Sequence, residues 1–156
     1  MNQTARSRSR LDRGFTLLET VITVFLIAVL AAIALPAYSK YSDRAKSLQV
    51  TSDLGAMQAQ IEVYAREMRV YPATLAAAGL GGTIDPWGNA YVYYNVEANG
   101  RGHARKDRAL NPINTDYDLY SMGPNGVTKP QITHSDSVDD IIRASNGSYL
   151  GVASGF

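Results

Sequence analysis

The amino-acid sequence predicts an α+β fold, in which a long N-terminal α-helix, half transmembrane and half amphipathic, packs on a small antiparallel β-sheet. Three observations lead to it. Residues 15–35 are apolar except for Glu19, and apolar residues then recur at helical spacing to about residue 70. Beyond Pro72, turn residues alternate with short segments rich in tyrosine and β-branched side chains, a composition typical of strands.

The apolar run predicts one membrane-spanning helix over residues 15–36. At about 1.5 Å per residue it spans roughly 30 Å, which is enough to cross the hydrocarbon core of a bilayer. The first fourteen residues hold four arginines and one aspartate, and an excess of basic residues marks the cytoplasmic side of a span. We therefore expect residues 1–14 to be a cytoplasmic leader.

The helix is expected to continue past Pro36 as an amphipathic segment over residues 37–71. Apolar residues recur in it at three- and four-residue steps and form one stripe, which would pack on the sheet. The helix should end near Val70, because the position before Pro72 disfavours the α conformation. The stripe consists of Tyr41, Ala45, Leu48, Leu54, Met57, Ile61, Tyr64 and Met68.

Residues 72–156 are expected to form a β-domain. A short helix is predicted at residues 73–79, and strands are predicted at residues 90–96 and 117–122, each next to a cluster of turn residues. The end of the chain, from residue 131 onward, is polar apart from a short apolar patch at Ile141 and Ile142.

The loop predicted over residues 97–114 carries a cluster of basic side chains. Such a cluster could contact nucleic acid or an anionic lipid surface. It lacks interleaved aromatic residues, and the net charge of the whole chain is only +1. We therefore expect a solvated loop that faces neighbouring subunits, and no nucleic-acid partner. The cluster comprises Arg101, His103, Arg105, Lys106 and Arg108.

Glu19 is the one charged residue of the apolar run. A carboxylate inside a membrane span costs on the order of 3 kcal/mol or more, and the next basic residue of its own helix is Lys40. Cleavage of the chain after Gly14 would give Phe15 a free ammonium, which could neutralise Glu19 of an adjacent chain. The alternative is a glutamate that lies near the membrane interface and has no role.

The segment from Gly14 to Glu19, Gly-Phe-Thr-Leu-Leu-Glu, resembles the class III signal of type IV pilins and type II secretion pseudopilins. The resemblance implies a pilin-like fold, and it implies that a prepilin peptidase cleaves after Gly14 and methylates the new N-terminus at Phe15. By the same resemblance Glu19 is needed for assembly and Pro36 kinks the helix. It also implies a single-pass protein of the bacterial inner membrane, with a cytoplasmic N-terminus and a periplasmic β-domain.

Three motifs of the C-terminal part resemble the major pseudopilin of type II secretion: Tyr71-Pro72, residues 85–89 (Asp-Pro-Trp-Gly-Asn) and residues 117–123 (Tyr-Asp-Leu-Tyr-Ser-Met-Gly). By this resemblance the chain is a structural subunit and not an enzyme. It would assemble with copies of itself, with minor pseudopilins and with an inner-membrane assembly platform. The product would be a periplasmic filament, the pseudopilus, which drives protein export through the outer membrane.

Two other functions stay open at this point. The chain could be a type IV pilin or a competence pseudopilin, although many type IV pilins close their C-terminal loop with a cysteine pair and this chain has no cysteine. From another class, it could be a membrane-anchored binding protein that works as a monomer. In that case Glu19 would be incidental.

The resemblance also implies calcium as a possible cofactor of the C-terminal loop, since Ca²⁺ is held by carboxylates and carbonyl groups. The candidate ligands are the carbonyl of Met122, the side chain of Asn125, and the carboxylates of Asp139 and Asp140. Asn125 stands where the family usually has an aspartate, which removes one negative charge and should weaken binding. The alternative is a solvated acidic loop without a metal.

Overall fold

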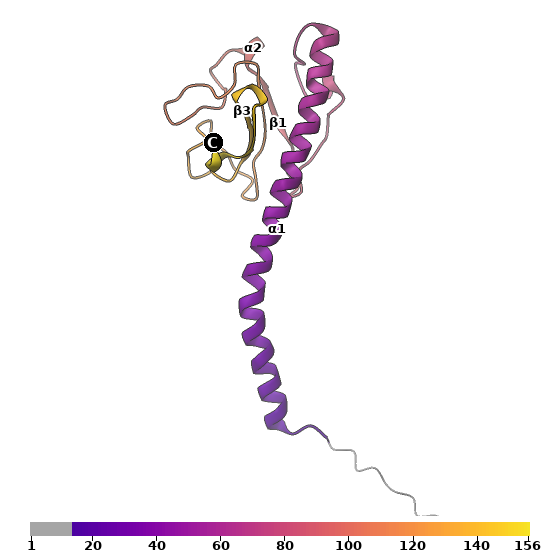
Figure 1. The fold of residues 1–156 in the computed structure, drawn as a ribbon, viewed down its shortest axis with the longest axis vertical. Coiled ribbons are helices and arrows are strands. Elements are labelled where there is room, and N and C mark those ends of the chain that lie inside the picture. The colour runs from indigo at the N-terminus through magenta and orange to yellow at the C-terminus, as the bar shows by residue number, and fades with distance from the viewer. Residues whose placement is uncertain (1–13) are drawn as a thin grey trace, which may run out of the picture. The chain divides into compact units, whose positions relative to one another are not determined.

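The computed structural model describes residues 14–156, so the predicted leader lies outside the described residues except for Gly14. The chain divides into two units, residues 1–40 and residues 41–156. Helix α1 (Leu17–Met68) begins in the first unit and ends in the second, as Figure 1 shows. The helix therefore continues past Pro36, as predicted, while a kink at this residue stays a prediction.

The second unit holds a four-stranded antiparallel sheet in the order β1-β2-β3-β4. The strands are β1 (Val92–Asn95), β2 (Tyr117–Ser121), β3 (Ile141–Ala144) and β4 (Tyr149–Val152). Each strand pairs with the next one along the chain. The antiparallel sheet, β1 and β2 confirm the sequence predictions, whereas β3 and β4 were not predicted.

Four short helical segments lie between the strands or beside them. Three are 3₁₀ turns, η1 (Ala76–Ala78), η2 (Ser145–Gly147) and η3 (Ala153–Gly155). The fourth is α2 (Val96–Asn99), which occupies the start of the predicted basic loop. Asn95 caps α2 by accepting a hydrogen bond from the N–H of Ala98 at 2.9 Å, because an N-cap side chain satisfies a free donor of the first turn.

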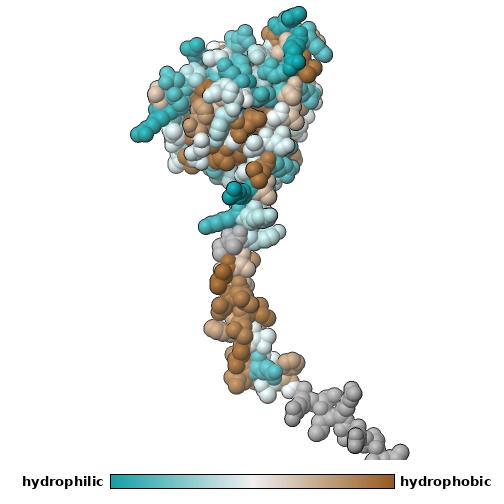
Figure 2. All heavy atoms as spheres, viewed as in Figure 1, coloured by the Kyte–Doolittle hydropathy of each residue, from teal (hydrophilic) through white to brown (hydrophobic). Residues whose placement is uncertain are grey.

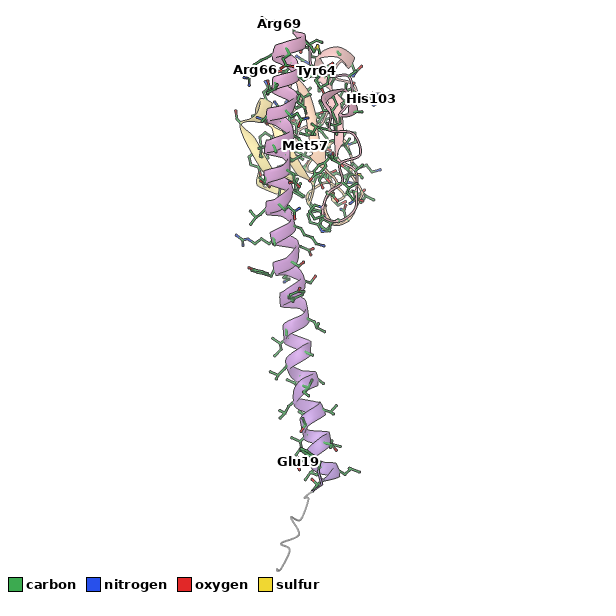
Figure 3. All side chains as sticks on the ribbon, turned by 90° about the vertical axis from the view of Figure 1, so that its right-hand side faces the viewer. Glu19, Met57, Tyr64, Arg66, Arg69 and His103 are labelled. Atoms are coloured by element: carbon green, nitrogen blue, oxygen red, sulfur yellow. The ribbon has the colours of Figure 1, made fainter. Side chains whose placement is uncertain are left out.

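The core of the second unit lies between α1 and the sheet, where Figure 3 labels Met57. The helix contributes Val50, Leu54, Met57 and Ile61, and the strands contribute Tyr117, Leu119 and Ile141. These helical positions recur at three- and four-residue steps, so the spacing of the predicted stripe was right from Leu54 to Ile61.

The first part of the predicted stripe was wrong, and so was its last residue, Met68, which is 59% exposed. Tyr41 and Leu48 are 75% and 65% exposed, and Ala45 is exposed as well. The buried face of α1 runs instead through Val50, whose side chain is fully buried. One helical turn N-terminal to Val50, the buried face of α1 holds polar residues. The apolar residues at the start of the segment therefore lie on a different face of the helix.

Candidate functional site

The first turn of α1 places the predicted processing and assembly residues next to one another. The hydroxyl of Thr16 accepts a hydrogen bond from the N–H of Glu19 at 3.2 Å, which caps the helix start. Glu19 lies in the first turn, where the helix dipole favours an acid (Figure 3). Gly14, Phe15, Thr16 and Glu19 line one hollow on the surface. Phe15 is 79% exposed, so the bond after Gly14 lies beside an accessible residue.

The apolar part of α1 has no covering within this chain. Its side chains are exposed from Leu17 to Leu30, and Figure 2 shows this segment as mostly brown, with polar side chains near its start. The helix is long and apolar enough to cross a membrane, and no part of that stretch is buried. The hydroxyls of Thr20 and Thr23 donate to backbone carbonyls of the helix, at 2.8 and 2.7 Å. These polar groups therefore need no water.

The Asp-Pro-Trp-Gly-Asn motif at residues 85–89 is a structural turn. The buried carboxylate of Asp85 accepts hydrogen bonds from the N–H groups of Trp87 and Asn89, at 3.0 and 2.9 Å. Its other oxygen accepts from the hydroxyl of Ser121 in β2. Asn89 in turn donates to the carbonyl of Gly123 at 3.2 Å. The motif thus fixes the turn to the end of β2 and is not a reactive site.

The structure brings Asn125 and Asp139 together. The amide nitrogen of Asn125 donates to the carboxylate of Asp139 at 2.7 Å and to the carbonyl of Asp136 at 3.3 Å. The amide oxygen accepts from the N–H of Val127 at 2.8 Å. Rotating the amide would turn its oxygen toward a carboxylate, so the observed orientation is the only one that satisfies both ends.

Asp140 pairs with Arg105, 35 residues earlier in the chain, and both side chains are buried. The hydroxyl of Thr128 also donates to the Asp140 carboxylate, at 2.6 Å. The prediction of a solvated basic loop was therefore wrong for Arg105. The prediction failed because the partner of Arg105 is the buried Asp140, which lies too far along the chain for local sequence spacing to reveal it. The other basic side chains of the cluster are exposed or half-buried, as predicted.

As they are arranged, the four predicted calcium ligands do not fit a calcium ion. Ca²⁺ requires six to eight oxygen ligands. Asn125 presents its N–H₂ group, not its oxygen, to Asp139, and Asp140 already carries the positive charge of Arg105 beside it. Met122 follows β2 and is half-buried. Within residues 14–156, no three acids or histidines converge as a metal site. Calcium binding by these residues therefore stays a prediction, which titration of the chain with calcium tests.

A second buried network holds β2 and β3 together. Arg143 forms an ion pair with Asp116 at 2.6 Å, and its guanidinium lies over the ring of Tyr117 at 3.9 Å. Asn114 donates to the carboxylate of Asp118 at 2.9 Å. Burial raises the pKa of Asp118, and its hydrogen bonds offset part of the rise. Asp116 also lines an open hollow, but its carboxylate is taken up by the guanidinium of Arg143, so the network stabilises the sheet.

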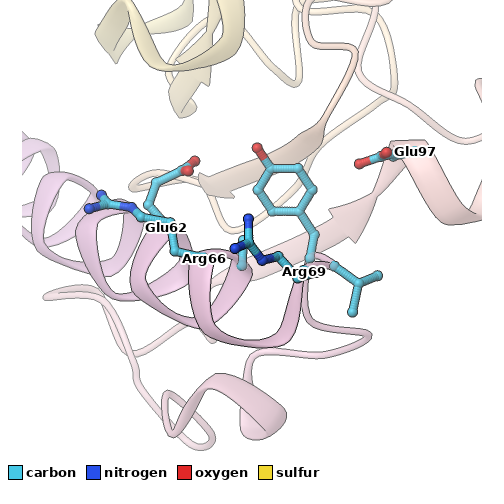
Figure 4. Close-up of a pocket in the computed structure, with 7 residues that line it drawn as sticks. Glu62, Arg66, Arg69 and Glu97 are labelled. Atoms are coloured by element: carbon cyan, nitrogen blue, oxygen red, sulfur yellow. The ribbon is translucent and has the colours of Figure 1, made fainter.

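A mixed-charge hollow lies at the C-terminal end of α1 (Figure 4). Its lining includes Glu62, Arg66, Arg69 and Glu97, two acids and two bases from α1, the chain after it and α2. Glu62 also accepts a hydrogen bond from the buried Tyr117 at 3.3 Å. Charges of both signs on an open surface suit a contact with solvent or protein, and they place no nucleophile beside a base.

Sequence reasoning missed two features of these sites. The Thr16-Leu17-Leu18-Glu19 segment has the pattern of a capping box, which marks a helix start and was available in the sequence. The burial of Arg105 had no local signal, since its partner belongs to a loop far along the chain.

Comparisons with known proteins agree with this arrangement. Residues 9–35 match the prokaryotic N-terminal methylation motif. The type II secretion system core protein G of Escherichia coli K12 is 30% identical over 136 residues, which cover 74% of this chain and 83% of that protein. The protein of the same name from Pseudomonas aeruginosa is 27% identical over 138 residues, or 75% and 87% of the two chains.

A fimbrial relative matches a shorter part of the chain. The fimbrial protein EcpC of Eikenella corrodens is 35% identical over 92 residues, which cover 58% of this chain and 60% of that protein. No solved structure matches the chain.

Proposed function

The chain belongs to the family of the type II secretion system core protein G, and from this premise we propose that it is cleaved after Gly14, methylated at Phe15 and assembled into a periplasmic pseudopilus. It is a structural subunit of the pseudopilin type and not an enzyme. The filament would drive protein export through the outer membrane.

One observation carries the proposal: the apolar half of α1 exposes all its large side chains and buries none. A soluble monomer does not expose a continuous apolar surface of this length. Lipid covers such a helix before assembly, and helices of other subunits cover it in a filament. The apolar helix and the methylation motif fit a protein anchored in a membrane by one span.

The second support is the position of Glu19. Its carboxylate lies in the first turn of α1 and lines the same hollow as Phe15. After cleavage the ammonium of Phe15 would lie at a comparable depth, where Glu19 of a neighbouring chain would neutralise it. Each unpaired charge at that depth is costly, so the pair favours docking of one subunit on another.

The remaining parts of the proposal concern place and partners. The basic leader keeps the N-terminus in the cytoplasm, and the β-domain lies in the periplasm. The partners are copies of this chain, the prepilin peptidase, minor pseudopilins and the inner-membrane assembly platform. A type IV pilin or a competence pseudopilin is the second candidate, supported by the 35% identity to a fimbrial protein.

Deletion of the chain, followed by complementation with Gly14→Ala, tests the proposal. Deletion should abolish secretion of exoproteins, and the variant should accumulate as an uncleaved precursor that does not restore it. Loss of surface pili or of DNA uptake, with normal secretion, would instead favour the second candidate. A Gly14→Ala chain that matured and secreted normally would contradict cleavage at this bond.

A further inference from the structure

We propose that the guanidinium of Arg105 takes the place of a metal ion in this chain, so that the β-domain keeps its C-terminal loop, residues 123–140, without calcium. The inference concerns the fold of the second unit. It holds whether the filament serves secretion or adhesion.

Arg105 joins segments that are far apart in the sequence. One nitrogen of its guanidinium pairs with Asp140, and another donates to the hydroxyl of Thr128 and to the carbonyl of Lys129, the latter at 2.7 Å. Its backbone N–H donates to the carboxylate of Asp118 in β2 at 2.6 Å. One residue therefore connects the middle of the C-terminal loop, and its end at Asp140, to the sheet.

The ion pair is fully enclosed, which makes each partner dependent on the other. The exposed fraction of the side chain is 3% for Arg105 and 0% for Asp140. The guanidinium also lies over the ring of Tyr120, 4.3 Å from its centroid, where a cation is attracted by the π face. Removing one charge of a buried pair leaves the other uncompensated, which strongly destabilises a fold.

The backbone around Arg105 is tied to the same loop. The N–H of Lys106 donates to the carbonyl of Pro130 at 2.8 Å, and the carbonyl of Lys106 accepts from the N–H of Ile132 at 2.9 Å. The buried hydroxyl of Ser137 accepts from the N–H of Lys129 at 2.7 Å. Hydrogen bonds from the residue after Arg105, and others within the loop, thus hold the loop in place beside the ion pair.

Asn125 lies near the start of the loop and completes the arrangement there. A divalent cation would draw the Asn125 and Asp139 side chains together through their oxygens. Here a neutral amide does so by donating a hydrogen bond to Asp139 at 2.7 Å. The positive charge required by the buried acid comes from Arg105, and a cation at Asp140 would lie beside this guanidinium and be repelled by it.

Thermal unfolding of the full chain in detergent, with EDTA and then with excess CaCl₂, tests the proposal. A site filled at about 100 times its Kd would raise the Tm by roughly 10 °C. We expect no rise in the wild-type chain, and isothermal titration with CaCl₂ should show no binding heat. A rise of this size, or stoichiometric calcium binding, would overturn the proposal.

The role of Arg105 is tested in EDTA by Arg105→Gln, with Arg108→Gln as the matched control from the exposed part of the same loop. We expect Arg105→Gln to lower the Tm by about 10 °C or more, and the control to leave it unchanged. Arg105→Lys, which keeps the charge without the planar fork, should lie between them. Equal Tm values for Arg105→Gln and the control would overturn the proposal. If Arg105→Gln does not fold, the lysine variant and the wild-type calcium titration still decide.

Discussion

The hydroxyl of Tyr91 donates a hydrogen bond to the carboxylate of Asp53 at 2.9 Å, and so joins the segment before β1 to helix α1. Burial raises the pKa of Tyr91, and the hydrogen bond to Asp53 raises it further. The pKa values of Tyr93 and Tyr117, which lie in the same sheet, are raised by burial as well. The β-domain therefore favours protonated tyrosines.

The raised pKa of Tyr91 predicts loss of stability in alkali. An unfolded chain releases its tyrosine protons near pH 10, whereas the folded chain keeps them. Above pH 10 the folded state binds more protons, so the free energy of unfolding falls as pH rises. Between pH 10 and its own raised pKa, Tyr91 alone lowers this free energy by roughly 1 kcal/mol per pH unit. Urea unfolding of the detergent-solubilised chain at several pH values measures this slope.

Tyr91→Phe should make the alkaline slope shallower, although it lowers stability at neutral pH through the lost hydrogen bond. Tyr41→Phe, at a side chain that is 75% exposed, is the matched control for the loss of a tyrosine hydroxyl. An alkaline slope for Tyr91→Phe equal to that of the wild type would contradict the role of the Tyr91–Asp53 bond.

The position of Gly123 should tolerate no side chain. Its φ is +66°, and a Cβ added there would clash with the carbonyl oxygen of Asp139. Gly123→Ala should destabilise the domain by at least about 2 kcal/mol, from the left-handed backbone and the clash. Gly102→Ala, where a Cβ meets no atom within 4 Å, should change stability little. Thermal unfolding compares the two, and equal Tm values would show that the loops are not packed as described.

The exposed apolar residues Tyr41 and Leu48 predict a contact between subunits. They lie seven residues apart on one face of α1, away from the core. The double variant Tyr41→Ser with Leu48→Ser should change the free energy of unfolding by less than about 0.5 kcal/mol but reduce the yield of filaments.

Leu54→Ala is the comparison variant for this double variant, because the Leu54 side chain is fully buried in the core. It should cost about 2–5 kcal/mol of stability. The measurements are thermal unfolding and an immunoblot of the sheared filament fraction. Normal filament yield from the double variant would place the contact on another face of α1.

The elements that local patterns specify were predictable from the sequence. The apolar run gave α1, and the turn clusters beside tyrosine-rich segments gave β1 and β2. Strand β3 has only Ile141 and Ile142 as apolar signals before Arg143, and burial of this arginine depends on Asp116, 27 residues earlier. The buried pair of Arg105 and Asp140 escaped prediction for the same reason. Charges are assigned to the surface unless a distant partner is known.

Assembly through Glu19 is tested most directly by Glu19→Ala, expressed in cells that lack the wild-type chain. Mass spectrometry of the N-terminal peptide reports cleavage and methylation at Phe15, and an immunoblot of the filament fraction reports assembly. Glu67→Ala is the control, because Glu67 is an exposed acid near the other end of α1.

We expect both variants to be cleaved and methylated, and only Glu19→Ala to be depleted from filaments, by more than about tenfold. An unpaired ammonium at membrane depth costs about 3 kcal/mol, which exceeds the 1.4 kcal/mol of a tenfold change. Glu19→Ala chains that enter filaments as efficiently as Glu67→Ala chains would contradict assembly through this pair.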